Sequence, residues 1–152
     1  MTLSWATAGD AEALAQVHAA GFDPPWDAAA FRDLFAGPGV FGLLARDGDR
    51  PAGMGLFRVV AGEMEVLTLA VDPAARRQGL ARAVMTAALG AARAAGAEAA
   101  FLEVAADNAP AAALYAALGF RREGLRRGYY DRGPAGRMDA VVMRLDLTSR
   151  AP

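Results

Sequence analysis

The stretch VLTLAVDPAARRQGLA, residues Val66–Ala81, carries the strongest structural signal in the chain. It begins as an apolar strand that stops at Asp72-Pro73, and Gly79 opens an amphipathic helix after a short arginine-rich loop. The start of a helix exposes unpaired backbone N–H groups and the positive end of the helix dipole, so it favours a bound phosphate. Gly79 and Ala81 have almost no side chain, which lets a ligand approach the backbone closely. We therefore expect this turn to bind a pyrophosphate.

Arg76 and Arg77 would add positive charge beside the same turn. Two other phosphate-binding motifs are excluded, because the G-x-G-x-x-G spacing of a Rossmann fold is absent and no Gly-Lys-Ser/Thr follows as in a P-loop. The turn alone is a weak functional signal, since a glycine between a strand and a helix often has only a structural role.

Composition restricts the class of protein. The 152 residues predict a single domain, 1–152, and the hydrophobic fraction of 55% argues against disorder. No apolar run approaches the roughly 20 residues that span a bilayer, so no membrane partner is expected. No signal peptide is apparent at the first residues. The net charge of -1 argues against direct nucleic-acid binding.

The numbers of cysteines and histidines exclude several kinds of catalytic and metal site. The chain has no cysteine, which excludes disulfides and thiolate chemistry and makes a cytoplasmic location the expectation. Its single histidine, His18, argues against a His-based metal site and against a Ser-His-Asp triad. No metal is therefore predicted.

Apolar runs separated by turn residues predict a mixed α/β domain with the element order β-α-α-β-β-β-α-β-α-β-β. We expect helices at 11–18, 28–35, 79–95 and 109–118. We expect strands at 3–6, 40–46, 54–60, 64–71, 99–104, 121–130 and 138–145.

Two side chains late in the chain are candidates for acid–base chemistry. Glu103 lies near the end of a predicted strand among apolar neighbours, and a partly desolvated carboxylate is suited to be a general base. Alternatively, Glu103 only accepts a hydrogen bond at the edge of the sheet. Tyr115 lies on an Ala/Leu-rich helix, where a phenol either packs in the core or protonates a leaving thiolate. Asp107 or Asn108 caps this helix, or Asn108 points its amide into a site.

Together these features resemble the GNAT family of acetyl-CoA-dependent N-acetyltransferases over nearly the whole chain. RRQGLA, residues 76–81, is similar to the family's Q/R-x-x-G-x-G/A pyrophosphate signature. More narrowly, the chain resembles the RimI group, which acetylates the N-terminal alanine of a small-subunit ribosomal protein. The stretches that carry this resemblance are Pro25-Trp26, LTLAVDP at 67–73, FLEV at 101–104 with Asn108, ALY at 113–115 through Phe120, and Tyr129-Tyr130.

The resemblance implies a three-layer fold with a central mixed, mostly antiparallel sheet of about seven strands and helices on both faces. The sheet should splay between its fourth and fifth strands, and acetyl-CoA should bind in the opening. The cofactor-binding residues implied are Leu69, Val71, Arg76, Arg77, Gln78, Gly79, Leu80, Ala81 and Asn108.

The resemblance also implies that Glu103 is the general base and Tyr115 the general acid. The acceptor amine must lose a proton before it attacks. An N-terminal α-amine, with a pKa of about 8, loses its proton far more easily than a lysine with a pKa of about 10.4, so it suits a carboxylate base. Glu65 is the competing base, because other acetyltransferases of this superfamily use a carboxylate on the strand that holds Glu63 and Glu65. Alternate residues of a strand share a face, so Glu65 would point the same way as Leu67 and Leu69. Alternatively, Glu63 and Glu65 only begin a solvated strand. The acceptor cleft would be lined by Pro25, Trp26, Tyr129 and Tyr130. The arginines of the closing strand, Arg121, Arg122, Arg126 and Arg127, are expected on a solvated face.

Two positions depart from the pattern of the group. Ala105 stands where an arginine usually follows Glu-Val, and Met138 stands where a glutamate often precedes Asp139. Both lie close to the expected peptide cleft. The leading hypothesis is an acetyltransferase that acts on a protein N-terminus. The alternatives are a GNAT enzyme for a small amine, such as an antibiotic, a polyamine or a free amino acid, and a non-catalytic acetyl-CoA-binding module.

Overall fold

The computed structural model describes residues 1–148 and contains one seven-stranded sheet with the strand order β1-β2-β3-β4-β5-β7-β6. The element order matches the prediction throughout. The strands are β1 (Thr2–Ala6), β2 (Val40–Asp47), β3 (Arg50–Val60), β4 (Glu63–Val71), β5 (Ala99–Ala105), β6 (Arg121–Asp131) and β7 (Arg137–Asp146). The helices are α1 (Ala11–Ala19), α2 (Ala28–Phe35), α3 (Leu80–Ala94) and α4 (Ala109–Ala117). Three 3-10 turns complete the order, η1 (Ala8–Asp10), η2 (Pro73–Ala75) and η3 (Gly133–Ala135).

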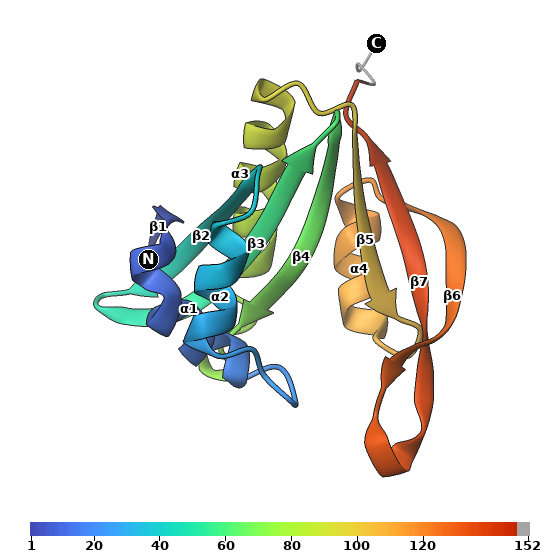
Figure 1. Cartoon of the computed structure of the whole chain (residues 1–152), viewed down its shortest axis with the longest axis horizontal. Helices are drawn as coiled ribbons and strands as arrows, with labels where there is room; N and C mark the ends of the chain where they lie inside the picture. Colours follow the sequence, from blue (N-terminus) through green and yellow to red (C-terminus); the bar gives the residue numbers. More distant parts are fainter. Residues whose placement is uncertain (149–152) are drawn as a thin grey trace.

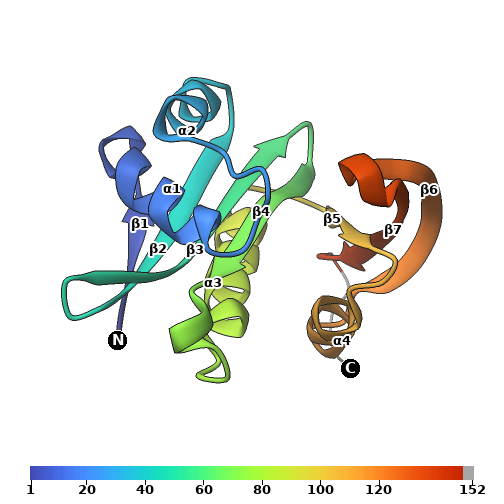
Figure 2. The same cartoon turned by 90° about the horizontal axis from the view of Figure 1, so that it is seen from below.

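The helices cover both faces of the sheet, which confirms the predicted three-layer arrangement. Figure 2 shows α1 and α2 on one face and α3 and α4 on the other. The face under α3 and α4 is packed by residues such as Val84, Met85 and Leu102, whereas the face under α1 and α2 is packed by residues such as Leu14 and Phe31. No helix in the described part of the chain has the length and hydropathy needed to cross a membrane.

The sheet splays between β4 and β5, as predicted (Figure 1). These two strands are parallel, whereas every other neighbouring pair is antiparallel. They pair only where Glu63–Glu65 lies beside Ala99–Phe101, at the beginning of each strand. Because both strands run in the same direction, the open end lies where each of them finishes. The open end is thus next to the connections that lead into α3 and α4.

A β-bulge interrupts β4 close to the point where the splay begins. Thr68 pairs with Leu56 of β3 and Val66 pairs with Phe57, so Leu67 has no partner on β3. A bulge places two consecutive side chains on nearly the same side and reverses the alternation beyond them.

The faces of β4 follow this reversal. Val66 and Leu69 pack toward α3, whereas Leu67 and Ala70 pack toward α1 and α2. Regular alternation from Val66 places Glu65 on the α1 and α2 side. The expectation that Glu65 and Leu69 share a face is therefore wrong, because the bulge at Leu67 reverses the alternation of side chains between them.

Side-chain caps begin two of the helices where the sequence indicates. Asp27 Oδ1 accepts a hydrogen bond from the backbone N–H of Ala30 at 2.8 Å, and this caps α2. Asn108 Oδ1 accepts from the N–H of Ala111 at 3.2 Å and caps α4. The neighbouring Asp107 is instead bound by both terminal nitrogens of Arg132, at 2.6 and 2.9 Å. This bidentate pair ties the β6–β7 hairpin to the start of α4.

Candidate active site

The open end of the splay has two helix N-termini beside it, those of α3 and α4. Gly79 is the N-cap of α3 and has a φ of 73°, a left-handed conformation that glycine adopts without steric cost. Gly79 is exposed, as are Arg76, Arg77 and Gln78, whereas Leu80 is buried behind them and Ala81 is half-buried. The first N–H groups of a helix have no partner within it, so this turn offers exposed donors to an anion.

Backbone groups of β4 also face the opening. The N–H of Asp72 donates to the carbonyl of Ala52 on β3 at 2.8 Å. Backbone polar groups alternate in direction along a strand, so those of Val71 and Leu69 point away from β3. They point to the side from which β5 has diverged. This edge can therefore form hydrogen bonds with an extended ligand in the way that a neighbouring strand would.

A cavity of about 550 Å³ lies between β4, β5 and the loop from α1 to α2. It brings together seven of the residues singled out in the sequence, which are Trp26, Leu69, Glu103, Asn108, Tyr115, Tyr129 and Tyr130. Pro25, Val71 and residues 76–81 are not among its lining residues. Pro24 takes the wall position expected for Pro25, and Ala105 also lines the cavity.

Glu103 is held by three residues of β6. Its Oε1 accepts from Arg126 at 2.8 Å, and its Oε2 accepts from the Tyr129 hydroxyl at 3.4 Å. The Tyr130 hydroxyl donates to its backbone carbonyl at 3.3 Å. Arg126 also lies 4.6 Å from the centre of the Tyr129 ring, a cation–π contact. Arg126 is exposed, as expected for the closing strand, and it is also the ion-pair partner of the candidate base.

Tyr115 is a buried phenol on α4. Its ring packs edge-on against Phe120, with the ring centres 5.9 Å apart, and only 8% of the residue is exposed. Burial, together with the neighbouring Tyr130, raises the pKa of Tyr115 to about 12. The phenol therefore keeps its proton throughout the neutral range and is a hydrogen-bond donor at the cavity wall.

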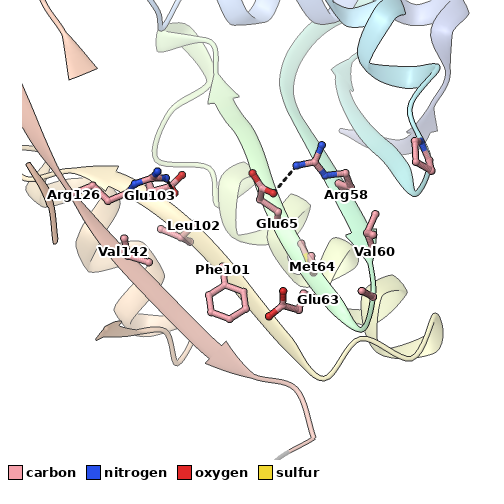
Figure 3. Close-up of a pocket in the computed structure, with 12 residues that line it drawn as sticks. Arg58, Val60, Glu63, Met64, Glu65, Phe101, Leu102, Glu103, Arg126 and Val142 are labelled. Atoms are coloured by element: carbon pink, nitrogen blue, oxygen red, sulfur yellow. Dashed lines mark hydrogen bonds and ion pairs between the residues drawn. The ribbon is translucent and has the colours of Figure 1, made fainter. Parts of the chain in front are cut away.

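Glu65, the competing base, lies outside this cavity. Its Oε2 accepts from Arg58 of β3 at 2.7 Å, and the two side chains lie on the wall of a second, adjoining cavity (Figure 3). Glu103 lines both cavities, whereas Glu65 lines only the second. Among residues 1–148, no three potential ligands converge to bind a metal ion.

His18 contributes to the cavity, although the sequence indicated no role for it. The residue is 1% exposed, and its Nδ1 accepts from the backbone N–H of Trp26 at 3.1 Å. The imidazole stacks between Phe22 and Trp26, with ring centres 4.1 and 4.9 Å away. It thereby fixes the α1–α2 loop against the cavity. The sequence offers one signal for this position, since His18 follows Ala11, Leu14 and Val17 at helical spacing on the buried face of α1.

We expect His18 to make stability depend on pH. Burial lowers the pKa of His18 from 6.5 to about 4, so the folded protein holds it neutral while the unfolded chain protonates it. The stabilisation is complete above pH 6.5 and is lost as the pH falls from 6.5 to 4, by about 3 kcal/mol at most. Urea unfolding at several pH values would measure this. His18→Gln retains an acceptor for the Trp26 N–H but does not titrate. Its free energy of unfolding should therefore lack the fall between pH 6.5 and 4 that His18 causes. An equal fall in the free energy of unfolding over this pH range in the two proteins would contradict the prediction.

Thr68 is a second residue that the sequence did not single out. Its hydroxyl is buried and has no hydrogen-bond partner within residues 1–148, yet Thr68 lines the 550 Å³ cavity. Buried hydroxyls are usually paired, so this oxygen is an exception beside the cavity. Alternate residues of β4 are buried, and Thr68 is the one polar residue among them; the others are Met64, Val66 and Ala70. A polar residue in an apolar strand is the signal in the sequence that could have singled it out.

Comparisons with known proteins agree with this geometry. The acetyltransferase (GNAT) family matches residues 11–120. The chain is 38% identical to N-alpha-acetyltransferase RimI of Mycobacterium tuberculosis, over 96% of this chain and 92% of that protein. It is 39% identical to the [ribosomal protein bS18]-alanine N-acetyltransferase of Escherichia coli, over 64% of this chain and 65% of that enzyme. The crystal structure of the ribosomal-protein-S18-alanine N-acetyltransferase from Escherichia coli superposes with a TM-score of 0.87 at 32% identity, covering 99% of this chain and 96% of that one.

Proposed function

Since the chain belongs to the GNAT family of acetyltransferases, we propose that it transfers the acetyl group of acetyl-CoA to the N-terminal α-amine of a protein. The relative from Mycobacterium tuberculosis is named an N-alpha-acetyltransferase, which supports an α-amine as acceptor. The proposed acceptor is a small-subunit ribosomal protein that begins with alanine, as the name of the relative from Escherichia coli suggests. The observation that carries the proposal is that Glu103 and Tyr115, from different elements, line one cavity at the open end of the splay.

Acetyl-CoA is proposed to bind across this opening. The exposed turn Arg76–Gly79, with Leu80 and Ala81, would bind the pyrophosphate through its N–H groups, its two guanidiniums and the positive end of α3. The free backbone groups of Leu69 and Val71 would pair with the pantetheine arm. Asn108 uses its amide oxygen to cap α4, which leaves its NH₂ group for the ligand.

Glu103 is proposed to take the proton of the attacking amine. An α-ammonium with a pKa of about 8 is largely protonated at pH 7, so the nucleophile must lose a proton before or during attack. One proton of the ammonium passes to the carboxylate, directly or through one water, and the neutral nitrogen then bonds to the acetyl carbon. The nitrogen gives up its second proton as the tetrahedral intermediate collapses. The thioester oxygen gains negative charge, and a backbone N–H near Leu69 would stabilise it.

Tyr115 is proposed to stabilise the leaving sulfur. As the C–S bond breaks, the sulfur takes the electron pair, and the phenol donates a hydrogen bond and then its proton to it. A free thiol has a pKa of about 8.5, well below the value of about 12 for Tyr115. Complete transfer to the thiolate is therefore uphill, so we expect the phenol to release its proton to sulfur only as it takes the second proton from the attacking nitrogen.

The acceptor is proposed to enter between the α1–α2 loop and the β6–β7 hairpin. Trp26, stacked on His18, would form one wall, and Tyr129 and Tyr130 would form the other. Pro25 would act by fixing the loop before Trp26. Aromatic walls of this kind favour a small first residue such as alanine.

The proposal is tested by measuring thiol release from acetyl-CoA with two peptides. One starts with alanine and copies the N-terminus of the ribosomal protein, and the other is the same peptide with its α-amine blocked. We expect turnover with the free α-amine alone, which mass spectrometry would locate at the first residue. Turnover with both peptides would instead indicate a side-chain acceptor.

A small-molecule amine is the second candidate acceptor, and Ala105 is the observation that favours it. This alanine lines the cavity where the RimI group usually has an arginine, so one side chain expected to contact a peptide is missing. No turnover with either peptide, together with turnover on polyamines or free amino acids, would support this candidate. Acetyl-CoA binding without transfer to any amine would support the non-catalytic module.

A further inference from the structure

The imidazole of His18 has a hydrogen-bond donor that the mechanism above does not use. Its Nδ1 accepts from the backbone N–H of Trp26 at 3.1 Å. A neutral imidazole whose Nδ1 is an acceptor carries its proton on Nε2, so Nε2–H is the donor. Burial lowers the pKa of His18 to about 4, which keeps the ring neutral at pH 7. Within residues 1–148, no atom accepts a hydrogen bond from Nε2.

This free donor lies at the surface of the 550 Å³ cavity. Within residues 1–148, the fully buried side-chain nitrogen or oxygen that lacks a partner is Thr68 Oγ1. Nε2 of His18 also lacks a partner but is not such an atom, so it is not fully covered. His18 as a whole is almost completely buried, and it lines this cavity. The small part of His18 that remains accessible therefore includes Nε2–H.

The ring that carries the donor is held in one orientation. The rings of Phe22 and Trp26 stack on it, with interplanar angles of 8° and 17°. Phe31 packs edge-on against it, with the ring centres 5.5 Å apart. The backbone carbonyl of His18 accepts from the N–H groups of Gly21 and Phe22, at 3.0 and 3.1 Å. Because both the ring and its attachment are fixed, the donor is oriented before any ligand binds.

The donor also lies close to the proposed reaction site. The chain just after His18 contacts β4, since a Cβ on Gly21 would lie 4.0 Å from the Cβ of Ala70. Ala70 belongs to the part of β4 that is proposed to pair with the pantetheine arm. Glu103 lines the same cavity from β5. An acceptor whose amine lies at Glu103 would therefore have its next atoms in the space that His18 borders.

The chemistry of Nε2–H determines what it can bind. An α-ammonium has only donors, so it cannot pair with an N–H group. The low pKa of His18 also makes it a poor base for that ammonium. The first hydrogen-bond acceptor beyond the amine of a peptide is the carbonyl oxygen of the same residue. Simple amines such as polyamines lack this oxygen.

We propose that His18 donates a hydrogen bond from Nε2 to the carbonyl oxygen of the acceptor's first residue, and thereby selects acceptors in which a carbonyl follows the amine. This inference rests on the proposed function, since it requires a peptide acceptor. The bond holds the first residue by its backbone, whatever its side chain. A carbonyl held by a fixed donor orients the amine toward Glu103.

The test compares two acceptors in the unmodified protein and in His18→Phe. One acceptor is the alanine-starting peptide, and the other has a trans-alkene in place of its first peptide bond, which keeps the shape but removes the carbonyl oxygen. We expect the ratio of kcat/KM for the peptide to that for the alkene to fall about threefold to tenfold in His18→Phe. The alkene also lacks one N–H, but that loss is common to both proteins and cancels in the comparison.

Phe22→Leu is the matched control for loosening of the α1–α2 loop. It removes the ring that stacks on one face of His18 but keeps the Nε2–H donor. Any loss through the loop should affect both acceptors alike, so the ratio should stay as in the unmodified protein. A fall of the ratio as large as that in His18→Phe would assign the effect to packing and overturn the proposal.

A spectroscopic measurement on the unmodified protein needs no substitution at all. His18 is the only histidine in the chain, so a ¹⁵N spectrum of histidine-labelled protein contains a single imidazole. We expect the free protein to show the tautomer protonated at Nε2. With CoA present in place of acetyl-CoA, so that no transfer occurs, the Nε2–H resonance should move downfield with the peptide and not with the alkene.

The outcomes separate this hydrogen bond from the proposed function. If the peptide is acetylated but His18→Phe leaves the ratio unchanged, or if the peptide does not move the Nε2–H resonance, the hydrogen bond is overturned while N-terminal acetylation stands. An equal loss of kcat with both acceptors would instead place His18 at the thioester carbonyl and overturn the proposal as well. If no peptide with a free α-amine is acetylated, the proposed function is wrong, and the hydrogen bond is overturned with it.

Discussion

Replacing Glu103 with glutamine is expected to lower kcat/KM for the alanine-starting peptide by about 10²–10⁴-fold at pH 7. Glutamine has nearly the same shape as glutamate, and its carbonyl oxygen can still accept a hydrogen bond from Arg126 or Tyr129. It cannot take a proton from the attacking amine. Only the proton-transfer step should therefore be lost, and the affinity for acetyl-CoA, measured by titration calorimetry, should stay within about twofold.

Glu65→Gln is the matched control, because Glu65 is also ion-paired to an arginine on the same side of the sheet but lies only in the second cavity. We expect this variant to retain most of the turnover. The assignment of the base would be wrong if Glu65→Gln lost activity while Glu103→Gln kept it. A higher pH should partly restore Glu103→Gln, since a larger fraction of the α-amine is then neutral without assistance.

Removing the hydroxyl of Tyr115 is expected to have the second largest effect. Tyr115→Phe should lower kcat by about 10²-fold with little change in KM, because the phenol would act on the leaving sulfur and not on the bound amine. The ring contact with Phe120 is kept, so the free energy of unfolding should change little. Steady-state kinetics together with urea unfolding would separate a catalytic from a structural loss.

An acetyl donor with a more acidic thiol provides a sharper test of this role. A thiol of low pKa leaves as a stable thiolate and needs no proton, so Tyr115→Phe should approach the activity of the unmodified protein with such a donor. Glu103→Gln should not be rescued, because its defect lies in the acceptor. Tyr130→Phe is the control for loss of a cavity phenol, since Tyr130 also lines the site and burial raises its pKa to about 12 as well. Equal loss in the Tyr115 and Tyr130 variants would argue against a specific acid.

The parts of the fold that could be predicted from sequence are those fixed by local chemistry. Asp27 and Asn108 cap helices because short polar side chains satisfy the free N–H groups of a first turn. Gly79 begins α3 in a left-handed conformation that few other residues adopt. The strands followed from apolar runs bounded by turn residues, and their order followed from the alternation with helices.

The parts that could not be predicted depend on contacts between distant segments. Arg126 reads as a surface charge because nothing in a closing strand indicates that its guanidinium reaches Glu103, 23 residues earlier. His18 reads as a core residue because its hydrogen bond to Trp26 depends on how the α1–α2 loop returns. The position of the bulge depends on the register against β3, which alternation within a single strand cannot reveal.

The bulge at Leu67 has a consequence for the length of the chain. A sheet distinguishes odd from even positions, so removing one residue from a regular strand exchanges its buried and exposed side chains. Leu67 is the exception in β4, because Val66 and Thr68 already pair with consecutive residues of β3 without it. A chain lacking Leu67 would keep Met64 and Val66 in the core. It would lose the local bend next to the reaction site and the side chain that packs toward α1 and α2 and lines the 550 Å³ cavity. At this one position a residue can be removed without exchanging the buried and exposed side chains on either side of it. The sheet can therefore form with or without the bulge.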